Sequence, residues 1–241
     1  MAAASDYALI FDMDGVLIDN TAYQARAFQL LFREHDLTTN ARRLLERLNG
    51  MPATNILKTV FRHTVPEKDL KKYADQREFL YRVLYWNKRR EAAGLTNFLT
   101  AARSAGFKIG LGTASPPETI EYIIDHLHLR HLFDTITGKA DVERGKPHAD
   151  TFTVAAKQLK VAPERCIVFE DAVLGEQSAY KAGMRCVCLS TSVKASKFQN
   201  PMKVIKDFTE ITPQDVLDLV EQFPNAPKPN KQLAQRQYAK L

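Results

Sequence analysis

The chain has 241 residues, of which 45% are hydrophobic and 26% charged, and its formal net charge is +6. This is ordinary globular composition, long enough for one large domain or two modest ones, and no stretch approaches the roughly 18 apolar residues that suggest a membrane helix. Its first residues, MAAASDY, lack the charged start and apolar middle of a signal peptide, so we expect a soluble, cytoplasmic protein with no membrane partner.

The first predicted element is a buried strand over residues 7–11 that ends in two aspartates, Asp12 and Asp14. Residues two apart on a strand point to the same side, here about 6.6 Å apart at ~3.3 Å per residue. Gly15 permits a sharp turn around a ligand. One carboxylate can attack an electrophile while the other transfers protons. Two anions so close need a cation between them, and their hard oxygen ligands favour Mg²⁺.

The next segment, residues 20–95, is patterned as helices and shows no strand signal. A crossover between parallel strands needs only about a dozen residues, so this segment is predicted to be an inserted helical cap domain. The α/β core domain is then residues 1–19 and 96–224, and residues 225–241 form a basic, flexible tail or an oligomer contact. The cap carries a net charge of +7 and the core −5, as suits an anionic substrate held beside a metal ion, although most of these side chains can equally be solvated helix faces.

The remainder of the chain alternates apolar runs with helix-patterned stretches. Such alternation predicts βαβ units, and hence an α/β fold with a doubly wound parallel sheet. The runs are residues 107–112, 166–169 and 185–189, and the helical stretches are residues 116–128, 148–160 and 173–183. The three cysteines, Cys166, Cys186 and Cys188, lie in these runs and are expected to be buried, reduced thiols.

Further polar residues follow the later strands. Thr113, with the backbone of Ala114, can bind a phosphate oxygen, although threonine is also a common helix cap. Lys146 precedes Pro147, which favours an extended backbone and starts a helix, so the lysine is expected on a loop at the end of the sheet. An exposed salt bridge would also account for Lys146. Glu170 and Asp171 add two more carboxylates after the third strand, where Asp171 could instead be a helix N-cap.

These positions share one edge of the predicted sheet, because open α/β sheets bind ligands beyond the carboxyl ends of their strands. The motif DMDG at residues 12–15 and the later positions resemble the haloacid dehalogenase superfamily of phosphotransferases, over about residues 6–222. The resemblance implies that Asp12 is a nucleophile forming an aspartyl-phosphate and that Asp14 is the general acid and base. It implies that Thr113, Ala114 and Lys146 bind the phosphate, and that Mg²⁺ is held by Asp12, the backbone carbonyl of Asp14, Glu170 and Asp171.

The helical insertion looks like the cap of the β-phosphoglucomutase and phosphoglycolate phosphatase group. At two cap positions this chain departs from the mutases, with Gln24 in place of a histidine and Ala53 in place of an arginine that would hold a distal phosphate. Arg77 aligns with a cap lysine that reaches the active site in this group. The usual Pro-Gly near the hinge is replaced by Ala93-Gly94.

We therefore expect a Mg²⁺-dependent phosphatase that hydrolyses a small phosphorylated metabolite, such as a sugar phosphate. The alternatives are a β-phosphoglucomutase-type sugar-phosphate mutase, an inorganic pyrophosphatase, and a catalytically silent binding or regulatory protein on the same fold. Nucleic acid is not an expected partner, since four positive charges in the 17-residue tail do not make a reading surface. The sequence does not determine the oligomeric state, and a monomer is favoured.

Overall fold

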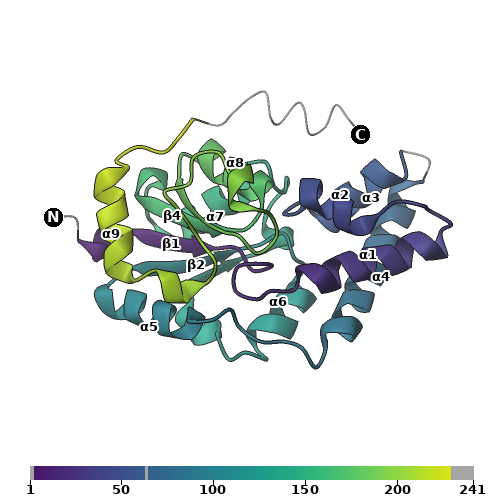
Figure 1. Ribbon diagram of the computed structural model, residues 1–241, viewed down its shortest axis with the longest axis horizontal. Helices are drawn as coiled ribbons and strands as arrows, with labels where there is room; N and C mark the ends of the chain where they lie inside the picture. The colour runs from purple at the N-terminus through teal and green to yellow at the C-terminus, as the bar shows by residue number, and fades with distance from the viewer. Residues whose placement is uncertain (1–2, 63–64, 229–241) are drawn as a thin grey trace.

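The computed structural model describes residues 3–62 and 65–228, in which one six-stranded sheet forms the centre of the molecule (Figure 1). All neighbouring strands run parallel, in the order β3-β2-β1-β4-β5-β6. The strands are β1 (Ala8–Phe11), β2 (Lys108–Gly112), β3 (Thr135–Thr137), β4 (Cys166–Glu170), β5 (Arg185–Leu189) and β6 (Lys203–Ile205). The expected α/β class with a parallel sheet is confirmed.

Helices cover both faces of this sheet, so its central strands are buried on both sides and read as continuous apolar runs. Alternate residues of β1 enter two separate cores: Leu9 and Phe11 face one, and Ala8 and Ile10 face the other. The helices are α1 (Thr21–Glu34), α2 (Ala41–Leu48), α3 (Ala53–Val60), α4 (Glu67–Tyr85), α5 (Leu95–Ala105), α6 (Pro117–Ile124), α7 (Asp150–Leu159), α8 (Val173–Lys181) and α9 (Pro213–Gln222).

Helices α5, α6 and α9 contribute side chains to the apolar core that contains Leu9, and α7 and α8 contribute to the core that contains Ile10. Between these elements lie short 3-10 turns. They are Ala4–Asp6, Arg130–Leu132, Lys139–Asp141, Pro163–Arg165, Ala195–Lys197 and Phe208–Glu210. After each of α5, α6, α7 and α8 the chain returns to the sheet as the next parallel strand, so the carboxyl ends of the strands lie at one edge.

Helices α1 to α4 lie together at one end of the molecule, beside the carboxyl edge of the sheet (Figure 1). They have an apolar core of their own, built from helical stripes that include Phe28, Leu31, Leu45 and Leu57. Asn40 caps α2 by accepting a hydrogen bond from the backbone N–H of Arg43 (3.0 Å). A separate core lets these helices behave as a unit distinct from the sheet.

The sequence analysis misses two strands, β3 and β6, and misplaces one helix start. Both strands are three residues long and lie at the edges of the sheet, and two residues of each are only half-buried. Short edge strands carry no continuous apolar run. Residues 146–149 form a turn, and α7 begins only at Asp150, so the expectation that Pro147 starts this helix is wrong.

Candidate active site

The exit from β1 places two carboxylates at the carboxyl edge of the sheet. The backbone N–H of Asp12 donates to Phe169 O on β4 (2.9 Å), which continues the sheet bonding one residue past the strand. Gly15 then adopts a positive φ of 77°, and its N–H donates to Ile18 O (2.8 Å). A Cβ at Gly15 would collide with the carboxylate of Asp171. Glycine is therefore required here both by the backbone conformation and by the close approach of Asp171.

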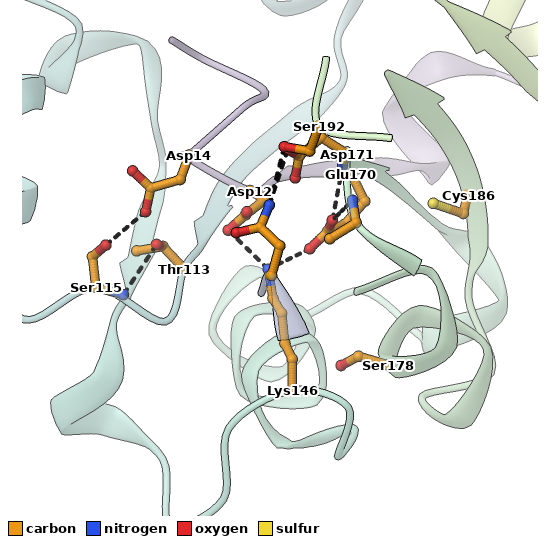
Figure 2. A network of polar contacts seen from close by, with 12 residues as sticks. Asp12, Asp14, Thr113, Ser115, Lys146, Glu170, Asp171, Ser178, Cys186 and Ser192 are labelled. Carbon is orange, nitrogen blue, oxygen red and sulfur yellow. Dashed lines mark hydrogen bonds and ion pairs between the residues drawn. The ribbon is translucent and has the colours of Figure 1, made fainter. Parts of the chain in front are cut away.

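Lys146 lies beneath Asp12 and is completely buried, so the alternative of an exposed salt bridge is wrong. Its Nζ is 2.8 Å from Asp12 Oδ1 and 2.6 Å from Glu170 Oε1 (Figure 2). Burial alone lowers the pKa of Lys146, but the two carboxylates outweigh it and raise that pKa. The lysine therefore stays charged and offsets part of the negative charge of the site.

Glu170 and Asp171 end β4 and, with Asp12, form a compact acidic cluster. One ligand oxygen from each of the three lies within 4.8 Å of the others. Glu170 Oε2 accepts the backbone N–H groups of Asp171 and Ala172 (2.8 Å each), which fixes its orientation. The N-cap residue of α8 is Ala172, so the alternative that Asp171 caps this helix is wrong. The side chain of Asp14 does not belong to this cluster.

The electrostatics of this cluster favour a bound cation. Burial raises the pKa of Asp12 to about 6, although the charge of Lys146 offsets part of the effect. Burial, and then the charges of Glu170 and Asp12, raise the pKa of Asp171 well above its usual range. Asp171 Oδ1 is buried and has no hydrogen-bond partner in the part of the chain that the structure describes. Three buried carboxylates with an orphaned oxygen and one shared lysine fit a hard divalent ion such as Mg²⁺.

Asp14 points away from this cluster, toward Ser115 (Figure 2). Its Oδ1 accepts from Asn20 Nδ2 (2.5 Å) and from Gln24 Nε2 (3.0 Å), and its Oδ2 accepts from Ser115 Oγ (2.9 Å). Burial and the charge of Asp12 raise the pKa of Asp14. A carboxyl with a raised pKa, held by three donors but separate from Lys146, suits proton transfer.

Thr113 and Ala114 follow β2 and face the same space. The backbone N–H of Thr113 donates to Thr137 O (3.0 Å), and its buried Oγ1 accepts from the N–H of Ser115 (3.2 Å). Both Thr113 and Ala114 line a cavity of about 50 Å³ that Asp12 and Asp14 also line. The structure thus brings the expected phosphate-binding residues beside the two aspartates.

Residues of the helical unit form the opposite wall of this cavity. Gln24 from α1 and Arg77 from α4 both line it, as the sequence analysis expects, and so does Ala53. The wall is otherwise largely apolar; its other members are Phe28, Leu45, Asn49, Gly50, Met51, Ile56 and Glu78. At about 50 Å³ the cavity is far below the ~300–1,000 Å³ of ordinary small-ligand sites, so the helical unit is closed over the carboxylates.

Several polar residues of the site are absent from the sequence analysis. Asn49 Nδ2 of the helical unit donates to Asp171 Oδ2 (3.3 Å) and to Ser192 Oγ (3.0 Å), and Ser192 Oγ also contacts Asp171 Oδ2. Asn49 and Ser192 are 143 residues apart in the sequence, so only the folded structure reveals this contact. Ser115 follows Thr113 and Ala114 directly after β2, so its place at the carboxyl edge of the sheet is a signal that could have found it.

Fold and site together define an α/β enzyme of phosphate chemistry, in which paired aspartates end the first strand beneath a helical unit. The profile of haloacid dehalogenase-like hydrolases matches residues 9–189, and the chain belongs to this family. A fructose-1-phosphate phosphatase of Escherichia coli (strain K12), YqaB, is 30% identical over 179 residues, which cover 74% of this chain and 94% of that protein. The family and its phosphatase relatives make the chain a phosphoric monoester hydrolase.

Two other similar proteins are mutases. A β-phosphoglucomutase of Bacillus subtilis (strain 168) is 27% identical over 187 residues, covering 75% of this chain and 81% of that protein. The crystal structure of a β-phosphoglucomutase from Clostridium difficile superposes with a TM-score of 0.82 at 23% identity, covering 90% of this chain and 98% of that one. The second likeness shows that the fold is shared.

The helices of residues 3–62 and 65–228 include none with the length and apolarity needed to cross a membrane.

Proposed function

We propose that this protein is a Mg²⁺-dependent phosphatase that hydrolyses a small phosphorylated metabolite, a sugar phosphate, through an aspartyl-phosphate intermediate. The observation that carries the proposal is that the two aspartates have different surroundings. Asp12 lies against Lys146 and the acidic cluster, whereas Asp14 lies apart, held by neutral donors and facing the cavity. One carboxylate is thereby prepared to attack and the other to carry a proton.

In the first step an oxygen of Asp12 attacks the phosphorus atom and the ester P–O bond breaks. Asp14, whose pKa is raised by burial and by the charge of Asp12, gives a proton to the departing ester oxygen. In the second step a water molecule attacks the phosphorus, Asp14 takes the proton of that water, and the P–O bond to Asp12 breaks to release inorganic phosphate. The carboxylate of Asp12 and the proton on Asp14 are both restored. Lys146, Thr113 and the backbone at Ala114 hold the phosphoryl oxygens.

The residues that would hold Mg²⁺ are Asp12, Glu170 and Asp171, together with the backbone carbonyl of Asp14. The ion would offset the charge of the transferring phosphoryl group and of the carboxylates that face it. Ser192 and Asn49, through their contacts with Asp171 Oδ2, would orient that ligand.

The domain division belongs to this proposal. Residues 20–95 are the cap and residues 1–19 with 96–224 the core, supported by the separate apolar cluster of α1 to α4. Because the closed cavity is small, the cap must open to admit substrate and then exclude water from the aspartyl-phosphate. The tail, residues 225–241, lies for the most part outside the described residues.

The choice of a sugar phosphate is supported by the relatives, which include a phosphatase of fructose 1-phosphate and a β-phosphoglucomutase. Mutase activity is the second candidate, favoured by the β-phosphoglucomutase relative of comparable identity. Ala53 argues against it, because its side chain cannot hold a second phosphate and it lines the cavity. A mutase would isomerise a sugar phosphate when primed with a bisphosphate and release little free phosphate.

The test is phosphate release from a panel of sugar phosphates, phosphoglycolate, nucleotides and pyrophosphate, with Mg²⁺ or with EDTA. Asp12→Asn protein serves as the control for contaminating phosphatases. Release that needs Mg²⁺ and is lost in the variant supports the proposal and names the substrate class. Absence of release from every compound, with correctly folded protein, would overturn it. Trapping of phosphate on Asp12 from a radiolabelled substrate after acid quenching tests the covalent intermediate separately.

A further inference from the structure

We propose that Glu78 is a specificity-determining residue of the cap. By neutralising Arg77 inside the cavity, it restricts the enzyme to phosphate esters whose leaving group carries no second anion. This inference rests on the proposed phosphatase function and narrows its substrate class to neutral, hydroxyl-bearing leaving groups.

The ion pair between Arg77 and Glu78 is formed within the cavity wall. Arg77 Nη1 lies 2.6 Å from Glu78 Oε1, and the two residues are 6% and 9% exposed. Glu78 Oε2 accepts from Thr119 Oγ1 on α6 (3.0 Å), so both oxygens of the carboxylate are engaged. The guanidinium lies over the ring of Phe28, 4.4 Å from its centroid. This arrangement fixes Arg77 and cancels its charge where the leaving group would lie.

Arg77 is the single cationic residue among the described residues that line the cavity. The rest of the cap wall offers mainly apolar side chains, such as Phe28, Leu45 and Ile56. A substrate with a carboxylate or a second phosphate would bury that charge against apolar groups and close to Glu78, with no free cation to compensate it. Such burial is strongly unfavourable. The cap wall therefore excludes second anions.

The same wall also contains buried polar atoms that could hydrogen-bond to neutral hydroxyl groups. Gln24 Oε1 and Arg77 Nε are buried and lack a hydrogen-bond partner within residues 3–62 and 65–228, although both residues line the cavity. One atom is an acceptor and the other a donor. A hydroxyl group can serve both, because it donates one hydrogen bond and accepts others. A polyhydroxy leaving group would satisfy these atoms without bringing charge.

The experiment compares pairs of esters that differ only by a neutral CH₂OH group and a carboxylate. Glycerol 3-phosphate with 3-phosphoglycerate is one pair, and glucose 1-phosphate with glucuronic acid 1-phosphate is another. The ratio of kcat/KM, neutral to anionic, is measured for wild type and for Glu78→Gln. Asp75→Asn is the matched control, because it removes a carboxylate from the same helix, where Asp75 pairs with Lys71 on the surface. Circular dichroism establishes that each variant is folded.

We expect wild type to favour the neutral ester by at least ~10-fold and Glu78→Gln to lower that ratio by at least ~10-fold, since it frees the charge of Arg77. Asp75→Asn should leave the ratio unchanged. Arg77→Gln, which leaves Glu78 unpaired, should raise the ratio, and it keeps the test decisive if Glu78→Gln does not fold.

Equal ratios in wild type, Glu78→Gln and Arg77→Gln would overturn this inference while phosphatase activity stands. The same holds if wild type prefers the carboxylate member of each pair. Failure of wild type to release phosphate from any ester of the panel would instead overturn the proposed function itself.

Discussion

At the scale of single residues, Lys146 is expected to contribute both to catalysis and to stability, and the two contributions can be measured separately. Its ammonium group lies between Asp12 and Glu170, and all three side chains are buried. It is therefore expected to hold phosphoryl oxygens during the reaction, and it also compensates buried negative charge in the protein before substrate binds. Removing one member of a buried ion pair leaves its partners without compensation.

Replacing Lys146 with Met should lower kcat/KM by at least ~100-fold through loss of its charge on the phosphoryl group. It should also lower the free energy of unfolding by ~3–5 kcal/mol, measured by urea denaturation in EDTA. Lys157→Met, at an exposed position on α7, is the control and should change neither quantity. A Lys146→Met protein as stable as wild type would show that the carboxylates do not need this cation.

The pH dependence of the reaction follows from Asp12. Its pKa is raised to about 6 by burial, and only the ionised carboxylate can attack phosphorus. On the acid side, activity should therefore fall as the pH drops through about 6, with kcat/KM declining tenfold per pH unit well below that value. A phosphate ester also titrates near pH ~6, so two esters with different phosphate pKa values must be compared. If the pH at which kcat/KM falls changes with the phosphate pKa of the ester, the titrating group is the substrate, which would contradict the assignment to Asp12.

At the scale of elements, the connection from α4 to α5 includes one tight turn. The chain reaches α5 through Ala93 and Gly94, and the carbonyl of Ala93 accepts from the N–H of Phe208 (3.0 Å). Gly94 has a φ of 77°, and a Cβ there would lie 2.9 Å from the backbone of Phe208 and of Thr209. The turn is thus packed directly against a second backbone segment of the core.

Gly94→Ala should destabilise the protein by at least ~2 kcal/mol, because a left-handed conformation and a backbone collision act together. Gly183→Ala is the matched control: its φ is also 77°, but a Cβ there would meet only Pro163 Cβ at 3.8 Å. It should cost about 1 kcal/mol, from the backbone conformation alone. Urea denaturation measures the free energy of unfolding of both variants. Equal losses would mean that the backbone near Phe208 shifts to make room for the added Cβ.

The central elements were predictable from the sequence because their residues are buried on both faces of a parallel sheet. The runs at residues 7–11 and 185–189 match β1 and β5 within a residue. Strands β3 and β6 were not predictable in this way, since an edge strand has fewer neighbours to bury it. The start of α7 was displaced because a proline fits a turn as well as the first turn of a helix.

The part of the candidate site that lies at the carboxyl edge of the sheet was also predictable, since the ends of parallel strands must share one edge. Asp12, Asp14, Lys146, Glu170 and Asp171 meet there, as the spacing of polar residues after apolar runs indicates. The cap half was less accessible. Contacts such as Asn49 with Ser192 or Glu78 with Thr119 depend on how two separate units meet, which no local pattern encodes.

At the scale of the whole molecule, a bound metal ion should stabilise the folded state. Mg²⁺ would bind the buried cluster of Asp12, Glu170 and Asp171, which exists only in the folded chain. A ligand that binds only the native state at 100 times its Kd adds about 2.7 kcal/mol to the free energy of unfolding. Wild type should therefore resist urea better in Mg²⁺ than in EDTA.

Asp171→Asn tests whether the stabilising Mg²⁺ ion binds at this cluster. The substitution removes one negative charge but keeps a side chain of nearly the same size. It should lose most of the increment that Mg²⁺ gives. The same increment in wild type and in Asp171→Asn would place the stabilising ion elsewhere.

The three cysteines give this protein a built-in reporter of unfolding. They are the only cysteines in the sequence, and all are completely buried in β4 and β5, on the side of the sheet that α7 and α8 cover. A thiol-reactive dye can therefore label the chain only when those helices separate from the sheet. If α1 to α4 open as proposed, α7 and α8 still cover that side of the sheet, so substrate could enter and leave many times without any labelling. The labelling rate would then measure how often the core itself opens during turnover.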